Sequence, residues 1–131
     1  MLELEGVRIL LVEDDDDSRE MTRMALEARG AILACAADAR AARDAIEHDP
    51  PDVLLSDIHM PGEDGHSLMR HLKPVLRKRG LRIPAVALTG LDSREARLRS
   101  RDAGYHYHLT KPVDPERLVE ILAGLARLTG R

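Results

Sequence analysis

The sequence predicts an α/β domain built on a doubly wound parallel sheet of five strands with five helices. Two observations carry this prediction. Short apolar runs alternate with helical patterns five times along the chain, and four of these runs lack polar alternation. Repeated strand–helix–strand units imply right-handed crossovers, which place helices on both faces of a parallel sheet.

The predicted strands are four short apolar runs and one alternating run. Each of the first four is too short for a buried helix and suits a strand covered on both faces. The fifth alternates and therefore predicts an edge strand with one covered face. Cys35, inside the second run, is interpreted as a small core residue. The runs are Ile9–Val12, Ile32–Ala36, Val53–Leu55, Ile83–Leu88 and Tyr105–Leu109.

The first three helical patterns each combine apolar residues at helical spacing with a residue that can begin or end a helix. The first ends at a glycine, the second has an aspartate cap and a closing proline pair, and the third has an internal proline and a glycine stop. Their residues are Met21, Met24, Ala25, Ala28 and Gly30; Asp38, Ala42, Ala45, Ile46 and Pro50–Pro51; and Leu68, Leu72, Pro74, Val75, Leu76 and Gly80.

The fourth helical pattern is the weakest and the fifth is clear. Asp92 and Glu95 resemble a capping box ahead of the segment REARLRSRD, which has a poor apolar face. In the fifth helix Asp114 is the expected cap and Pro115 the first helical residue. The apolar stripe of that helix is Leu118, Ile121, Leu122 and Leu125.

Length and composition exclude several classes of protein. The 131 residues, 44% of them apolar, suit a single domain over residues 1–131 with a core at about 7–128. The net charge of −3 gives no global sign of nucleic acid or an anionic membrane, and the absence of Phe and Trp provides little for base stacking. A single cysteine fits a reducing compartment, and no signal peptide or membrane span is evident. We therefore expect a cytoplasmic protein.

Polar side chains follow four of the five predicted strands. Glu13 and Asp14 come after the first, Asp57 after the third, Thr89 after the fourth and Lys111 after the fifth. Ligands of open α/β sheets bind outside the carboxyl ends of the strands, so these side chains are expected to meet at one edge. Each alone is explained as a helix cap or a solvated lysine. Their equivalent positions, and a lysine here in a chain with three lysines and seventeen arginines, favour a functional site.

The residue types at this edge suit phosphoryl transfer with a divalent cation. Glu13, Asp14 and Asp57 can share Mg2+ (or Mn2+), which prefers oxygen ligands and retains waters and phosphate oxygens. Asp57 can attack a phosphoryl group and form an aspartyl phosphate. The cation and Lys111 would stabilise the charge on the phosphoryl oxygens, and Thr89 would donate its hydroxyl to one of them.

Four segments carry a family resemblance: ILLVEDDDDSRE, DVLLSDIHMPGEDG, AVALTG and HLTKPVD. Together they resemble the receiver domain of two-component response regulators, of the CheY-like chemotaxis kind, from about Val7 to Leu128. The resemblance implies a flavodoxin-like sheet with strand order 2-1-3-4-5. It also implies a cis Lys111–Pro112 bond and assigns Gly65 to the tight turn after Met60-Pro61.

The resemblance implies a role for each residue at the edge. The side chain of His59 and residues Gly90 and Leu91 are expected near the phosphoryl group, where they would control water access. The implied metal ligands are Glu13, Asp14, Asp57 and the backbone carbonyl of His59; the phosphoacceptor is Asp57, assisted by Lys111 and Thr89; and the switch residues are Thr89 and His108. His108 stands where the family usually has Tyr or Phe, so its rotation is expected to depend on pH as well as phosphorylation.

The implied partners follow from the same resemblance. A phosphohistidine on a sensor histidine kinase or a histidine phosphotransfer protein would donate to Asp57. A downstream protein would read the switched surface, and a phosphorylation-dependent dimer is an option. The chain would be a signalling phosphoacceptor that catalyses its own phosphorylation and dephosphorylation rather than an enzyme. Direct binding to nucleic acid or to a membrane is not expected.

The remaining acids suit the start of a helix, and three other functions fit the sequence less well. Asp15, Asp16 and Asp17 begin the first helix, where acids favour the helix dipole and can cap N–H groups. The first alternative function is a degenerate receiver that docks without phosphorylation, against which the intact acids, Thr89 and Lys111 argue. An aspartate-nucleophile phosphohydrolase would need a second acid where His59 stands. A nucleotide-binding domain would need a glycine-rich phosphate loop, which is absent. Zinc at His106 and His108 lacks a third ligand.

Overall fold

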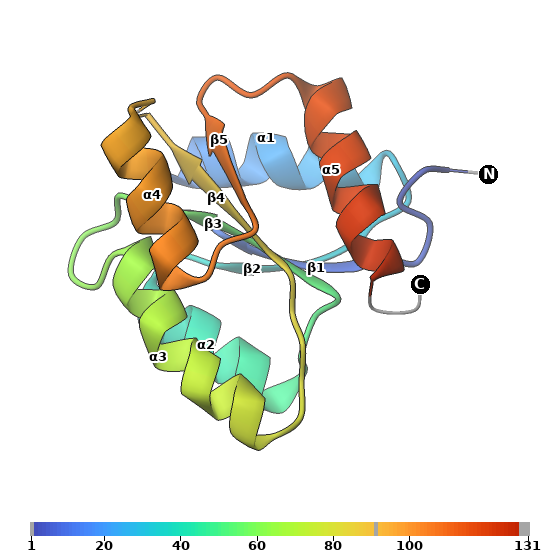
Figure 1. Ribbon diagram of the computed structural model, residues 1–131. Helices are drawn as coiled ribbons and strands as arrows, with labels where there is room; N and C mark the ends of the chain where they lie inside the picture. The colour runs from blue at the N-terminus through green and yellow to red at the C-terminus, as the bar shows by residue number, and fades with distance from the viewer. Residues whose placement is uncertain (1, 91, 129–131) are drawn as a thin grey trace.

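The computed structural model describes residues 2–90 and 92–128, which form one five-stranded parallel sheet with five helices (Figure 1). The strand order is β2-β1-β3-β4-β5, which confirms the predicted fold class and the order implied by the resemblance. The elements are β1 (Arg8–Val12), α1 (Asp16–Glu27), β2 (Ile32–Ala36), α2 (Ala39–His48), β3 (Val53–Asp57), α3 (Gly65–Lys78), β4 (Ala85–Thr89), α4 (Arg94–Ala103), β5 (Tyr107–Thr110) and α5 (Pro115–Arg127).

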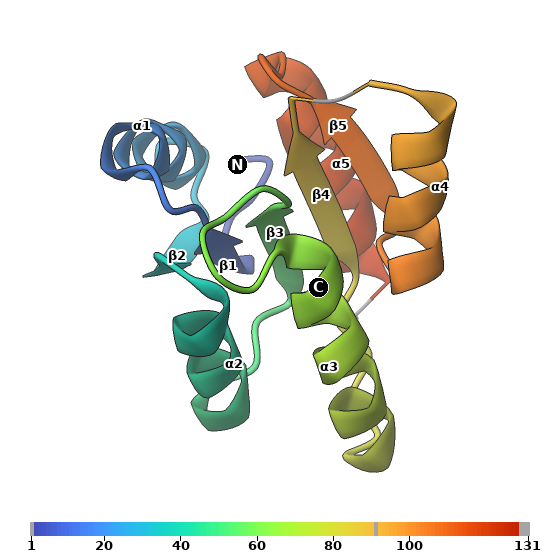
Figure 2. The same cartoon turned by 90° about the vertical axis from the view of Figure 1, so that its left-hand side faces the viewer.

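Helices cover both faces of the sheet. Helices α1 and α5 lie on one face and α2 and α3 on the other, with α4 beside β5 (Figures 1 and 2). Each face has its own apolar cluster, and the side chains of β1 and β3 alternate between the two. The central strands β3 and β4 are buried along their whole length. Parallel strands covered on both faces read as continuous apolar runs, which is why the sequence pattern identified them.

The second strand is less covered than its sequence predicts. β2 pairs with β1 alone and forms an edge of the sheet, and Ile32 and Cys35 are exposed. The interpretation of Cys35 as a core residue was therefore wrong. An apolar run shows that a strand can be buried, but its place in the sheet decides whether helices cover it.

The buried face of α1 also differs from the prediction. The methionines of the predicted stripe point outward, with Met21 72% and Met24 60% exposed. The helix instead turns Leu26 into the core, and the half-buried Arg19 extends its guanidinium to the carbonyl oxygen of Glu13. The covered positions of α1 are Arg19, Thr22, Arg23 and Leu26, two residues before the predicted stripe. Long arginine stems can cover apolar surface as methionine does.

The N-caps of α2 and α5 are the predicted residues, that of α3 was not predicted, and that of α4 differs from the prediction. Asp38, Asp64 and Asp114 accept backbone hydrogen bonds as N-caps of α2, α3 and α5. In α4 the cap is Ser93, whose side chain accepts from the backbone N–H of Ala96, so the predicted capping box beginning at Asp92 was wrong. A serine one residue later satisfies the same free N–H groups.

The last strand is shorter than the alternating run that predicted it. β5 begins at Tyr107, and Tyr105 is instead buried in the core, where its hydroxyl donates to the carbonyl oxygen of Gly65 at 2.7 Å. The prediction of β5 as an edge strand is confirmed by its pairing with β4 alone. In α3 and α5, Val75 and Ile121 are less buried than the other predicted stripe residues.

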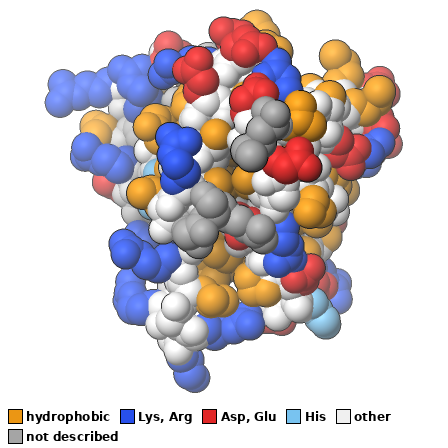
Figure 3. All heavy atoms as spheres, turned by 90° about the vertical axis from the view of Figure 1, so that its right-hand side faces the viewer, with side chains coloured by type: hydrophobic (Ala, Val, Ile, Leu, Met, Phe, Trp, Pro, Cys, Tyr) orange, Lys and Arg blue, Asp and Glu red, His pale blue; other side chains and the backbone are white. Residues whose placement is uncertain are grey.

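Charge is distributed unevenly along the chain. Residues 66–101 hold ten of the twenty lysines and arginines but only two of the twenty-three acids. Figure 3 shows cationic side chains along one edge and at the foot of the molecule, with acids over its upper part. The acidic excess belongs to the rest of the chain, which includes the carboxyl ends of β1 and β3. Within residues 2–90 and 92–128, no helix is long and apolar enough to cross a bilayer.

Candidate functional site

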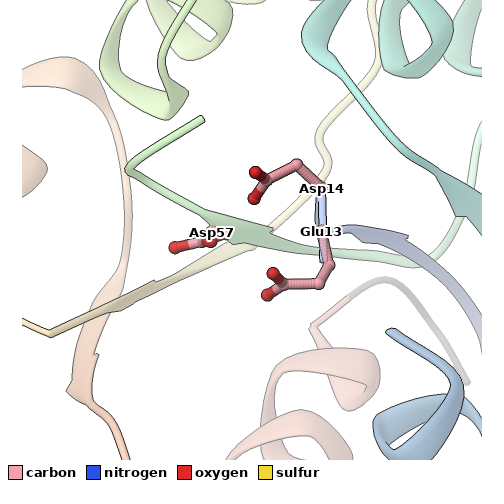
Figure 4. A group of neighbouring side chains, drawn as sticks. All are labelled: Glu13, Asp14 and Asp57. Carbon is pink, nitrogen blue, oxygen red and sulfur yellow. The ribbon is translucent and has the colours of Figure 1, made fainter. Parts of the chain in front are cut away.

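The carboxyl ends of β1 and β3 bring three carboxylates together. Val12 of β1 pairs with Ser56 of β3, so the next residues, Glu13 and Asp57, emerge side by side. With Asp14 they offer carboxylate oxygens that all lie within 4.8 Å of one another (Figure 4). In the part of the chain that the structure describes, this is the group of acids able to hold a metal ion. The predicted convergence of these three residues is confirmed.

A lysine from the far side of the sheet reaches the same acids. The Lys111 Nζ lies 3.0 Å from Glu13 Oε2 and 3.4 Å from Asp57 Oδ2. Its backbone N–H donates to the carbonyl oxygen of Thr89 at 2.8 Å, which fixes the residue just beyond β5. The Lys111–Pro112 bond is cis, as the resemblance implies. We call the cluster of Glu13, Asp14 and Asp57 the acidic edge. The backbone of Lys111 thus holds this residue at the acidic edge.

Burial makes this cluster electrostatically unusual. The exposed fraction of Glu13 is 4% and that of Asp57 is 6%. Burial raises the pKa of Glu13; the hydrogen bond from Lys111 opposes this, and the negative charge of Asp57 adds to it. Burial also disfavours the ammonium of Lys111, but Glu13 and Asp57 outweigh it and raise the pKa of Lys111. One cation thus faces three carboxylates, two of them buried.

The other predicted site residues lie around this cluster. Thr89 is buried at the end of β4, one residue beyond Leu88, which pairs with Asp57. His59 is two residues beyond Asp57, and its side chain is exposed, as is Gly90. Leu91 lies outside the described residues. The edge therefore gathers the carboxylates and Lys111 directly, with Thr89 on the neighbouring strand.

The three acids that follow Asp14 have structural partners. Asp15 is the N-cap of α1, and its carboxylate accepts from the backbone N–H of Ser18 at 2.8 Å. This hydrogen bond lowers the pKa of Asp15. Asp16 pairs with Arg19, and Asp17 lies in the first turn of the helix. These contacts agree with the helix-start interpretation of the acids.

Gly65, the first residue of α3, has a different role from the predicted one. A Cβ at Gly65 would lie 2.6 Å from the carbonyl oxygen of Asp57 and 2.9 Å from the Cα of Ile58. The positive φ of the turn after Pro61 belongs to Gly62, at +80°. Gly65 thus permits the start of α3 to pack directly against the backbone of Asp57.

Sequence reasoning missed a hydrogen-bonded group at the corner of α3, α4 and β5. Ser100 Oγ lies 2.8 Å from His108 Nδ1 and 3.2 Å from His66 Nε2. No sequence pattern could reveal it, because its members come from three elements that meet only in the fold. His106, two residues before His108, instead accepts a hydrogen bond at Nδ1 from the backbone N–H of Ala85 at 3.0 Å.

The parallel sheet and the polar edge define a flavodoxin-like α/β domain with its site at the carboxyl ends of the strands. The model of the response regulator receiver domain family matches residues 9–123, and the chain belongs to that family.

Two relatives and one solved structure illustrate the similarity. An uncharacterized 14.6 kDa protein of Leptolyngbya boryana is 37% identical over 93% of this chain and 92% of its own length. Response regulator MprA of Mycolicibacterium vanbaalenii is 38% identical over 94% of this chain, which spans 52% of that protein. The receiver domain of the Francisella response regulator 1452 matches with a TM-score of 0.85 at 28% identity, over 95% of this chain and 99% of that one.

Proposed function

We propose that this receiver domain is a working phosphoacceptor in which Asp57 accepts a phosphoryl group from a phosphohistidine. The observation that carries the proposal is the contact of Lys111 with both Glu13 and Asp57 inside a cluster of three carboxylates. A degenerate receiver would not need this partly buried and mutually repelling arrangement. A carboxylate nucleophile beside a fixed ammonium is instead suited to a phosphoryl group with charged oxygens.

In the proposed reaction an oxygen of the Asp57 carboxylate attacks phosphorus. A new O–P bond forms while the P–N bond to the donor imidazole breaks, and the electron pair of that bond stays on the imidazole nitrogen. Lys111 lies where it can pair with the phosphoryl oxygens, and Thr89 can donate its hydroxyl to them after transfer. The chain acts as a phosphoacceptor and not as an enzyme for a separate substrate.

The donor set of the site fits a hard divalent cation. Glu13, Asp14 and Asp57, with the backbone carbonyl of His59, would hold Mg2+ or Mn2+ through oxygen atoms alone. Burial, and after it the negative charge of Asp57, raise the pKa of Glu13 in spite of the hydrogen bond from Lys111, and a bound cation would favour the ionised carboxylate. When bound, the cation would supply the charge neutralisation that phosphoryl transfer needs.

The proposed partners are those of a two-component system. The donor would be a sensor histidine kinase or a histidine phosphotransfer protein, and a downstream protein would read the surface that Thr89 and His108 switch. Phosphorylation biases a two-state surface by drawing side chains toward the new charge. This surface would be formed by α4, β5 and α5.

The test is the intact mass of the protein after incubation with acetyl phosphate. We expect one phosphoryl adduct with Mg2+, none without Mg2+ and none in Asp57→Asn. Asp44→Asn, an exposed aspartate on α2, is the matched control and should be phosphorylated like the wild type. The aspartyl phosphate should be cleaved by hydroxylamine.

Two results would count against this function. An adduct in Asp57→Asn would show that the acceptor is another residue. If the wild type forms no adduct and also fails to bind beryllofluoride, the chain is a degenerate receiver that acts by docking.

A further inference from the structure

One buried serine joins two histidines from different elements. Ser100 of α4 is 1% exposed and His66, in the first turn of α3, is 5% exposed. The Ser100 hydroxyl contacts His66 on one side and His108 of β5 on the other. We call His66, Ser100 and His108 the histidine chain. Figure 2 shows α4 beside β5, and α4 also contacts α3.

The protons available in the histidine chain indicate which group donates and which accepts in each hydrogen bond. A serine hydroxyl has one proton to donate, and the hydrogen bonds of Ser100 Oγ among the described residues are those to the two histidines. His66 Nδ1 is buried and has no partner there. If Ser100 donated to His66, the hydrogen of the neutral His66 ring would sit on Nδ1 as a buried N–H without an acceptor. The opposite direction leaves only an unused lone pair, which costs less.

The surroundings of His66 favour the neutral form of its ring. Burial lowers the pKa of His66, and the positive charges of Arg99 and Arg70 lower it further. Asp64, the N-cap of α3, acts in the other direction, and His59 acts with the arginines. A neutral His66 with its hydrogen on Nε2 therefore donates to Ser100, which is left to donate to His108 Nδ1.

We propose that His66 and Ser100 are positioning residues that hold His108 in one ring position and one tautomer, with its hydrogen on Nε2. The histidine chain also approaches the acidic edge, because Gly65, next to His66, packs against the backbone of Asp57. It thus links the phosphoacceptor end of α3 to β5 through α4. This inference deepens the proposed function and rests on it only where it treats His108 as the switch.

The first experiment reads the tautomers of the wild-type protein directly. In long-range 1H–15N NMR spectra at neutral pH, we expect both His66 and His108 to carry hydrogen on Nε2 and none on Nδ1. A hydrogen on Nδ1 of either ring would overturn the proposed direction. This measurement needs no variant and no phosphorylation.

The second experiment removes each link in turn. Ser100→Ala should lower the population of the observed His108 ring position about fivefold relative to all others, the equivalent of one ordinary hydrogen bond. His66→Leu should let His108 populate both tautomers, whereas His66→Gln, which keeps an N–H donor, should retain the wild-type tautomer. Ser67→Ala, which removes a hydrogen bond from the first turn of α3 to Glu63 in the preceding loop, is the control and should leave His108 unchanged. An unaltered His108 in folded Ser100→Ala would refute the positioning role.

The third experiment separates this inference from the proposed function. Beryllofluoride should shift the NMR signals of both the His66 and the His108 ring in the wild type. In Ser100→Ala the shift of one ring should no longer accompany the shift of the other. If beryllofluoride shifts both rings equally in wild type and Ser100→Ala, the coupling is wrong although the receiver works. If beryllofluoride does not bind but the tautomers are as expected, the proposed function fails and the positioning of His108 stands.

Discussion

The acidic edge and the histidine chain handle polar groups in opposite ways. At the acidic edge Lys111 contacts two of the three clustered carboxylates, Glu13 and Asp57, so negative charge is in excess within this cluster. In the histidine chain no charged group takes part in the contacts of Ser100 with His66 and His108 as proposed, and one buried ring nitrogen of His66 has no partner among the described residues. Excess negative charge favours the arrival of a cation, and the cation together with Lys111 would then attract the charged oxygens of a phosphoryl group. A satisfied hydrogen-bond chain favours one fixed position.

The largest effect on stability is expected when the acidic edge loses its lysine. Lys111→Ala should lower the free energy of unfolding by about 1–2 kcal/mol in urea titrations without Mg2+. A fully buried pair would lose about 3–5 kcal/mol, but the Lys111 side chain is 36% exposed and water screens part of the interaction. The variant should still accept a phosphoryl group while its output surface fails to respond, as binding of a downstream partner would show.

Adding Mg2+ provides a second test of the stability predicted for Lys111→Ala. A ligand that binds the folded state alone raises stability, so Mg2+ should restore part of the loss in Lys111→Ala. Lys78→Ala, at the exposed end of α3, should cost a few tenths of a kcal/mol and show no additional response to Mg2+. If Mg2+ raised the free energy of unfolding of both variants equally, the idea that excess negative charge remains at the acidic edge would be contradicted.

The acidic edge could be predicted from sequence and the histidine chain could not. Strand ends in a parallel sheet lie at one edge by topology alone, so Glu13, Asp57 and Lys111 were placed correctly once their strands were found. Ser100 lies in the helix with the weakest pattern, and its partners depend on how α3 packs on α4. The packing of two helices side by side depends on contacts between residues far apart in the sequence. The apolar periodicity of one segment does not reveal these contacts.

The same distinction explains the errors in the fold. The strands and helices were located by their periods, but the covered face of α1 and the exposure of Cys35 were wrong. Both depend on where an element lies in the sheet and which long side chains lie across it. Met21 and Met24 satisfied the helical spacing, yet the covered face of α1 lies two residues earlier and buries Leu26.

A smaller loss of stability is expected from the removal of the Tyr105 hydroxyl, which contacts Gly65 next to the histidine chain. Tyr105→Phe should lower stability by about 1–1.5 kcal/mol, because it removes the hydrogen bond to the carbonyl oxygen of Gly65. Tyr107→Phe, exposed on β5, is the control and should change stability little. A loss as small as that of the control would show that the start of α3 does not depend on this contact.

The pH dependence of the same pair of variants gives a second readout. Burial raises the pKa of Tyr105, so the folded protein keeps the phenol proton above pH 10 while the unfolded chain releases it. Stability contributed by this group is therefore complete below about pH 10 and is lost as the pH rises further. Tyr105→Phe should lack this loss, so the difference between wild type and variant should shrink in urea titrations above pH 10.

The smallest changes in stability are expected at two neighbouring acids, Asp14 and Asp15, which have different roles. Asp15→Ala removes the N-cap of α1 and should cost about 1 kcal/mol, while phosphorylation by acetyl phosphate continues. Asp14→Ala should leave stability within a few tenths of a kcal/mol, because Asp14 relieves no free N–H group and its loss reduces repulsion at the edge, but the adduct should require much more Mg2+. Asp17→Ala is the control for both measurements. If Asp15→Ala impaired phosphorylation as strongly as Asp14→Ala, the division between a metal-binding pair and a helix start would be wrong, and the run of acids would have to act as one site.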